Sequence, residues 1–137
     1  MRLGELLIQR KLLTEEQLLK GLSRHYRSHE KLGECLILEG YISESALLQA
    51  LSTQLEVPYF EMIPTDLMSK DSLALIPGAL AKKWCVIAGE KDLGFIIFFN
   101  DNTTEVSEYL AQRDVSADYA LARKSEIRKA IDRFFKV

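Results

Sequence analysis

The sequence predicts an α+β protein, in which a duplicated four-helix unit precedes a small α/β unit with a roughly three-stranded sheet. The first observation behind this prediction is an internal repeat: residues 2–25 recur at residues 31–54 after a shift of 29 positions. The second is a change of pattern after Trp84, where helical spacing gives way to short apolar runs of strand length. One repeat unit cannot bury its apolar face alone, so the two copies are expected to pack together.

Two short helices are expected in the first copy. Leu3, Leu6 and Leu7 have helical spacing, and Thr14-Glu-Glu-Gln17 is a capping box that starts the second helix. The apolar face expected for this second helix consists of Leu18, Leu19, Leu22 and Tyr26.

The second copy repeats this pattern, with Ser43 as the N-cap of its second helix. Gly40 is well placed to end the first helix of this copy, at a position where a positive φ is favoured. Its counterpart in the first copy is Lys11. A lysine would adopt the same left-handed conformation at a cost of about 1 kcal/mol.

The rest of the chain is expected to alternate between strands and helices. Short helices are predicted at residues 70–76 and 78–83, and strands at 85–88, 93–99 and 116–121, with a turn at Gly89–Asp92. Further helices are predicted after the start signal at Asn100–Thr104 and from about Lys124. The predicted organisation is a duplicated helical subdomain at 1–56, a connecting segment at 57–83 and an α/β subdomain at 84–137.

The composition is that of a soluble globular protein, with 47% hydrophobic and 28% charged residues and a net charge of −2. A general nucleic-acid binder would carry a basic excess, so no nucleic-acid partner is expected. The longest apolar runs, Phe95–Phe99 among them, are far short of the roughly 20 residues that span a bilayer. Cys35 and Cys85 lie in unrelated segments and are expected to be free thiols in the cytoplasm.

Sequence motifs of the common enzymes are missing. The chain has no phosphate-binding loop, no Gly-x-Ser-x-Gly elbow and no His-Glu-x-x-His zinc motif. His25 and His29 lie four residues apart, but zinc generally needs three or four ligands. No catalytic residue, no metal site and no required cofactor is therefore predicted, and the chain is not expected to be an enzyme.

The candidate site is the corner that the repeat duplicates, Arg2-Leu3-Gly4 and Lys31-Leu32-Gly33. A cation beside a glycine at a helix N-terminus can bind a phosphate or a guanine edge, and glycine allows a close backbone approach. Two equivalent corners would suit a ligand that is itself two-fold. The alternative is that the glycines only allow close helix packing.

At these residues the chain resembles a known family, the N-terminal (MshEN) domain of type II secretion and type IV pilus assembly ATPases. The family motif, Arg-Leu-Gly-x-x-Leu-x-x-x-Gly followed by a helix that ends in Gln, occurs twice around a five-residue spacer. Here the spacer is Tyr26 to Glu30. The resemblance continues through Val57-Pro58-Tyr59 and Ile76-Pro77 and spans nearly the whole chain.

The resemblance implies a non-catalytic docking and regulatory domain that binds a cytoplasmic domain of an inner-membrane partner. It further implies a motor ATPase domain in the same or another chain, and a cytoplasmic location that is peripheral to the inner membrane through the partner. The alternative function that it implies is a cyclic di-GMP receptor. Carried over by position, the ligand contacts would be Arg2, Leu3, Gly4, Leu7, Leu18, His25, Lys31, Leu32, Gly33, Leu36, Gly40, Leu47 and Gln54.

Three positions depart from the family motif. Lys31 replaces the second arginine, Lys11 the first glycine and His25 the first glutamine. A lysine is a point charge and cannot form the planar two-pronged contact of an arginine. Each departure is expected to cost on the order of 1–2 kcal/mol of ligand binding.

Overall fold

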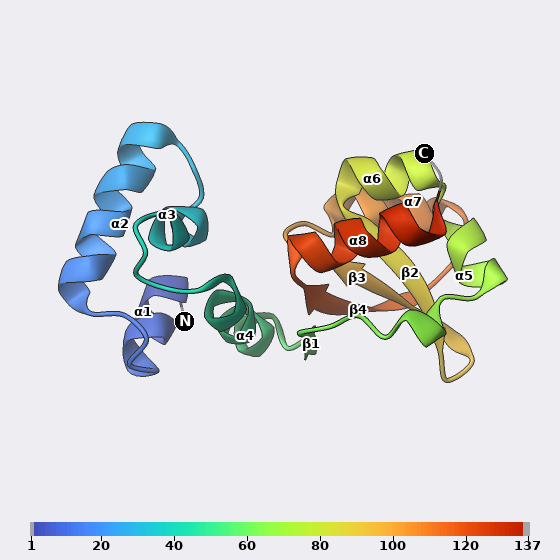
Figure 1. Ribbon diagram of the computed structural model, residues 1–137, viewed down its shortest axis with the longest axis horizontal. Helices are drawn as coiled ribbons and strands as arrows, with labels where there is room; N and C mark the ends of the chain where they lie inside the picture. The colour runs from blue at the N-terminus through green and yellow to red at the C-terminus, as the bar shows by residue number, and fades with distance from the viewer. Residues whose placement is uncertain (1, 136–137) are drawn as a thin grey trace. The chain divides into compact units, whose positions relative to one another are not determined.

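The computed structural model describes residues 2–135 and shows two compact units, residues 1–56 and 57–137. Within the described residues it contains eight α-helices, a short 3₁₀ helix (η1) and one four-stranded mixed sheet (Figure 1). The predicted α+β class, with a helical unit before a small α/β unit, is confirmed.

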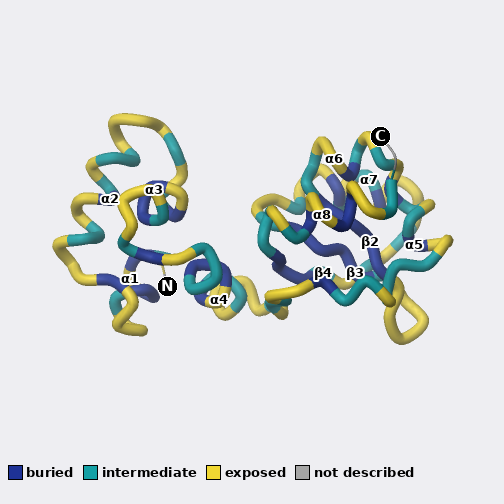
Figure 2. Tube along the Cα trace, in the orientation of Figure 1, coloured by how far each residue is buried: buried dark blue, intermediate teal, exposed yellow. Residues whose placement is uncertain are grey.

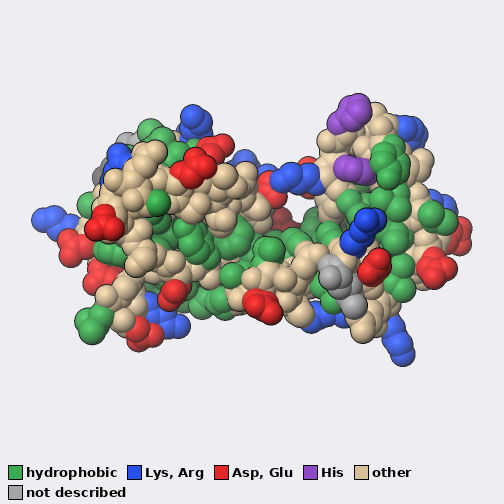
Figure 3. All heavy atoms as spheres, turned by 180° about the vertical axis from the view of Figure 1, so that it is seen from behind, with side chains coloured by type: hydrophobic (Ala, Val, Ile, Leu, Met, Phe, Trp, Pro, Cys, Tyr) green, Lys and Arg blue, Asp and Glu red, His purple; other side chains and the backbone are tan. Residues whose placement is uncertain are grey.

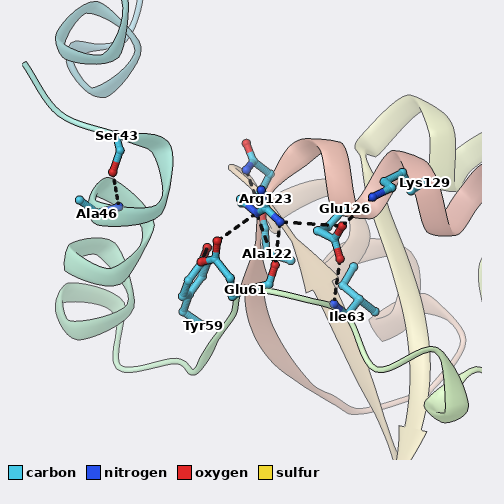
Figure 4. Close-up of polar contacts among 10 residues, drawn as sticks. Ser43, Ala46, Tyr59, Glu61, Ile63, Ala122, Arg123, Glu126 and Lys129 are labelled. Carbon is cyan, nitrogen blue, oxygen red and sulfur yellow. Dashed lines mark hydrogen bonds and ion pairs between the residues drawn. The ribbon is translucent and has the colours of Figure 1, made fainter. Parts of the chain in front are cut away.

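The first unit consists of α1 (Leu3–Gln9), α2 (Glu15–Ser28), α3 (Leu32–Leu38) and α4 (Glu44–Leu55). The capping box at the start of α2 is complete: the Gln17 N–H donates to Thr14 Oγ1 at 3.1 Å, and the Thr14 N–H donates to Gln17 Oε1 at 3.0 Å. Ser43 caps α4 by accepting from the Ala46 N–H at 3.1 Å (Figure 4). Side-chain oxygens therefore define where the longer helix of each copy begins.

The shorter helices α1 and α3 end in the same way. Lys11 and Gly40 both have positive φ, +60° and +79°, as the repeat predicted. Their N–H groups donate to Ile8 and Ile37 at 2.9 Å, and the following residues donate to Leu7 and Leu36 at 3.0 Å. This pair of bonds is the Schellman arrangement, which satisfies the last carbonyls of a helix. The prediction for both positions is confirmed.

The two copies pack in a crossed manner, because α2 lies against α3 and α1 lies against α4. A Cβ added at Gly21 of α2 would lie 2.5 Å from Leu36 Cδ2 of α3, which shows how closely these helices approach. The equivalent of Gly21 in α4 is Ala50, which has no exposed surface. The resulting core contains Leu6, Leu7, Leu13, Leu36, Ile42, Leu47 and Ala50.

One expectation about α2 is wrong. Leu19 and Tyr26 were expected on its buried face, but 67% and 73% of their surfaces are exposed. The buried side of α2 is centred on Gly21, and at 100° per residue both side chains lie on the far side of the helix from it. Apolar character alone did not distinguish the two faces.

The second unit is built around a sheet with strand order β1-β4-β3-β2. Strands β2 and β3 form an antiparallel hairpin, while β4 pairs in parallel with both β3 and β1. The strands are β1 (Tyr59–Phe60), β2 (Val86–Lys91), β3 (Gly94–Phe99) and β4 (Ala117–Ala122). The other elements are η1 (Thr65–Leu67), α5 (Lys70–Leu75), α6 (Gly78–Trp84), α7 (Thr104–Gln112) and α8 (Lys124–Phe134). Consecutive buried residues in β2, β3 and β4 show that both faces of the sheet are covered (Figure 2).

Residues 57–83, expected as a connecting segment, supply β1, η1, α5 and α6 of this unit. The fourth strand, β1, lies in this segment and was not expected, because its two residues are too few to form a strand pattern. It is held beside β4 by a hydrogen bond from the Leu121 N–H to the Pro58 carbonyl at 2.8 Å. The next residues are tied to the start of α8, where Glu126 Oε1 accepts from the Ile63 N–H at 3.2 Å and Arg123 donates to the Glu61 carbonyl (Figure 4).

The turn between β2 and β3 is shorter than predicted. Gly89, Glu90 and Lys91, expected in the turn, belong to the strand, and Gly89 pairs with Ile96. The turn itself is Asp92–Leu93, and both residues have positive φ, +52° and +66°. This two-residue geometry matches the right-handed twist of a hairpin, but it favours Asn and Gly over leucine.

Candidate functional site

The two copies of the candidate corner occupy equivalent helix starts. Arg2 is the N-cap of α1 and Lys31 the N-cap of α3, both in extended conformation. Their carbonyls accept the first helical hydrogen bonds, from Leu6 and Cys35, at 3.0 Å in each case. Neither side chain caps its own helix, and both are exposed. The first unit therefore presents one cation at each corner.

The glycines of the corners lie in close contact with leucines of the longer helices. A Cβ added at Gly4 would lie 2.9 Å from Leu18 Cδ1, and one at Gly33 would lie 2.8 Å from Leu47 Cδ2. Leu18 and Leu47 are equivalent residues of the repeat, so the contact is made twice. Both glycines therefore lie at close helix contacts, which supports the packing interpretation.

Polar contacts at the periphery follow the same internal symmetry. Arg10 donates to Thr53 Oγ1 at 2.6 Å, linking the end of α1 to α4. The equivalent positions, Glu39 and Arg24, form an ion pair at 3.1 Å between the end of α3 and α2. The residue types differ while the positions correspond, so this contact is made at equivalent places in the two copies.

The thirteen positions carried over for a ligand differ in their exposure. Leu7 and Leu36 have no exposed surface and Leu47 only 6%, so these leucines form the core. Leu3, Leu18 and Leu32 are half-buried around that core. The remaining positions are Arg2, Lys31, Gly40 and Gln54, which are exposed, Gly4 and Gly33, which are buried, and His25, which is half-buried.

His25 is held by the spacer between the copies. Its Nδ1 contacts the Glu30 carbonyl oxygen, which also accepts from Cys35 Sγ at 3.7 Å. A carbonyl can only accept, so Nδ1 carries the proton and Nε2 remains for other contacts. His29 ends α2 in a left-handed conformation and is exposed. Among residues 2–135 no group of three His, Cys, Asp or Glu side chains lies close enough to hold a metal.

Sequence reasoning missed a cavity of about 250 Å³ in the second unit. The cavity lies where α6 ends, where β3 ends and where α8 begins, and its lining includes side chains of both positive and negative charge. The lining residues are Lys83, Trp84, Cys85, Asn100, Asp101, Asn102, Glu105 and Lys124. Burial raises the pKa of the Cys85 thiol, and the charges of Arg128 and Lys124 oppose that rise. The polar run Asn100–Asn102 directly after a strand was the available sequence signal, because ligand sites often lie at strand ends.

Over the part of the chain that the structure describes, every helix is too short or too polar to cross a bilayer.

Comparison with known proteins identifies the class to which this architecture corresponds. No family model matches the chain. It is 28% identical, over 98% of its length, to the type IV pilus assembly ATPase PilB of Myxococcus xanthus, of which it spans 24%. It is 33% identical over 60% of its length to PilB of Thermus thermophilus, of which it spans 9%. The chain thus corresponds to a minor part of each of these proteins.

Solved structures give the same result for the fold. The structure of MshE with cdg (cyclic di-GMP) superposes with a TM-score of 0.83 at 26% identity, covering 98% of this chain and 99% of that one. The N-terminal domain of XpsE superposes with a TM-score of 0.68 at 18% identity, covering 98% and 94%. The resemblance to the N-terminal domain of type II secretion and type IV pilus ATPases is confirmed. It holds across both units.

Proposed function

We propose that this chain is a non-catalytic docking and regulatory domain that binds a cytoplasmic domain of an inner-membrane secretion or pilus protein. The observation that carries the proposal is the match to a pilus ATPase and to MshE over 98% of the chain. A motor ATPase domain, in the same or another chain, would be the machinery that this domain regulates. The domain would work in the cytoplasm and reach the membrane only through its partner, without inserting into it.

Exposed apolar side chains support a docking role. In the second unit Met62 is 73% exposed, and Leu93 stands fully exposed on the strained hairpin turn. Large apolar side chains in such positions gain free energy when a partner covers them. Backbone strain is also commonly retained at functional positions.

The test is a pull-down of the purified chain against cytoplasmic domains of inner-membrane secretion and pilus proteins. We expect one of them to bind, and Leu93→Asp to weaken that binding at least about fivefold, roughly 1 kcal/mol. Lys91→Asp, two residues away on the same hairpin, is the matched control for the added negative charge. Failure of every partner domain to bind would argue strongly against docking.

The second candidate function is a cyclic di-GMP receptor, which the approximate two-fold symmetry of the first unit favours. The chain's similarity to MshE, which was solved with cyclic di-GMP, also supports it. In this proposal the exposed cations Arg2 and Lys31 read the two guanine edges, and Gln54 and His25 are equivalent polar contacts. The half-buried leucines Leu3, Leu18 and Leu32 supply apolar surface, while Gly4, Gly33, Leu7, Leu36 and Leu47 hold the frame and Gly40 shapes the helix end.

Calorimetry with cyclic di-GMP tests this second function. Arg2→Ala should remove binding, because a charge-assisted hydrogen bond contributes about 1.5–3 kcal/mol. Lys31→Arg should tighten binding, since it restores a planar fork. Arg10→Ala is the matched control, because Arg10 lies at the opposite end of α1 and contacts Thr53. The absence of heat with about 1 mM ligand would refute this function and leave the docking proposal standing.

A further inference from the structure

The outward face of α2 carries apolar side chains that nothing in the first unit covers. Leu19 and Tyr26 lie seven residues apart, two helical turns, on the same side of the helix. Their surfaces are 67% and 73% exposed. Figure 2 shows exposed segments along α2, and Figure 3 shows apolar side chains at the surface beside the two histidines. The outward face, taken as the exposed residues around Leu19 and Tyr26, consists of Glu15, Glu16, Leu19, Lys20, Ser23, Tyr26 and Arg27.

The repeat provides an internal reference for this face. The equivalent of Leu19 in α4 is Leu48, which is only 3% exposed, and the equivalent of Tyr26 is Leu55, which is 49% exposed. The same helix positions are therefore apolar in both copies but more fully covered in the second. An exposed leucine and tyrosine at these positions are suited to a contact with another molecule.

The outward face is acidic at the start of α2 and basic at its end. The first turn carries Glu15 and Glu16, of which Glu16 forms an exposed ion pair with Lys20 at 3.4 Å, and the last turn carries Arg27. Ser23, a small residue, lies between Leu19 and Tyr26 and allows another helix to approach closely. A second α2 running antiparallel would place its basic end beside this acidic end, and the reverse, so that the contact is made twice. A parallel pairing would instead place like charges together.

We propose that the outward face of α2 docks on the α2 of a second copy of this chain, in an antiparallel pair related by a two-fold axis. Leu19 of each copy packs against Tyr26 of the other, and Arg27 of each copy faces Glu16 of the other. Antiparallel helix dipoles favour the same orientation. One helix face is smaller than the roughly 800 Å² per partner of a standard interface, so we expect a dissociation constant on the order of 100 µM.

Sedimentation of the whole chain between about 10 µM and 1 mM tests the pairing. We expect a concentration-dependent dimer that weakens at least fivefold in 0.5 M salt, because its charges are exposed. Leu19→Glu should abolish the dimer. Leu38→Glu, a change at a 57% exposed leucine on α3, is the matched control and should leave the dimer intact. A chain that stays monomeric at 1 mM, or that loses the dimer equally in both variants, would overturn the proposal.

A charge exchange tests the orientation separately. Glu16→Lys and Arg27→Glu should each weaken self-association about tenfold, because each places like charges together twice. An equimolar mixture of the two variants should regain a dimer, since every charge pair then becomes complementary. Circular dichroism checks that α2 remains helical in both. A mixture that is no more dimeric than either variant alone would refute the antiparallel pairing and leave these apolar residues to a different protein partner.

Discussion

Replacing Lys11 by glycine should stabilise the protein. Lys11 ends α1 with φ +60°, a conformation that its equivalent, Gly40, adopts at φ +79° without a side chain. The left-handed region costs a residue with a Cβ roughly 1–2 kcal/mol. A glycine removes that cost, but it adds about 0.4–1 kcal/mol of unfolded-state entropy that folding must overcome. The net expected gain is about 0.5–1 kcal/mol.

The opposite change supplies the matched control. Gly40→Ala should destabilise the protein by about 1 kcal/mol, although no atom lies within 4 Å of the added Cβ. This open surrounding makes the pair informative, because any loss arises from backbone conformation and not from a steric clash.

Urea unfolding followed by circular dichroism measures both variants. In a separate thermal unfolding experiment, a change of 1 kcal/mol should move the midpoint temperature by about 3 °C for a chain of this size. The m-value should stay constant, so that the shift reports native-state stability. If Lys11→Gly lowered the unfolding free energy, or if Gly40→Ala raised it, the conformational argument would be refuted.

Three further predictions concern a close helix contact, a hydrogen bond to the start of α8 and the thiol of Cys85. Gly33→Ala should lower the unfolding free energy by about 1 kcal/mol, measured in urea, because its Cβ would lie 2.8 Å from Leu47 Cδ2; an unchanged value would mean that Leu47 can move aside. Glu126→Ala should cost about 1–3 kcal/mol in the same assay by leaving the Ile63 N–H without its acceptor, whereas Glu126→Gln should recover much of that loss. Burial raises the pKa of Cys85, so its reaction with a thiol reagent should require a higher pH than that of a free cysteine. The contribution of the Cys85 thiol to the free energy of unfolding should be fully present below the thiol's pKa in the unfolded chain. That contribution should be lost as pH rises through the thiol's pKa in the folded chain. A Cys85 that reacts like a free thiol at every pH would contradict that shift.

The sequence was most informative where two copies could be compared. Capping residues at Thr14 and Ser43 located the longer helices, and the alignment of Lys11 with Gly40 predicted a left-handed lysine that composition alone would not suggest. These features are local, and local hydrogen bonds decide them. The same comparison supplied the residues of the two corners, whose use by a ligand stays a prediction.

Features set by long-range contacts were harder to predict. Strand β1 exists because residues 58–60 pair with β4, about 60 positions later in the chain. The faces of α2 depend on its packing against α3, which left Leu19 and Tyr26 on the outside although both are apolar. The cavity beside Trp84 is formed by three segments that are distant in sequence. No periodic pattern within one segment carries this information.

The crossed packing of α2 on α3 and α1 on α4 has a consequence for how the first unit could arise or be divided. Each copy of the repeat covers the other's helices, so neither copy is a self-sufficient piece. A peptide comprising residues 1–29 would have to recruit a second identical peptide to bury Leu7 and Gly21. The first unit is thus equivalent to a dimer whose two subunits have been joined into one chain. Once joined, the two copies could differ in residue type, as at Arg10 and Glu39, while keeping the same helix packing.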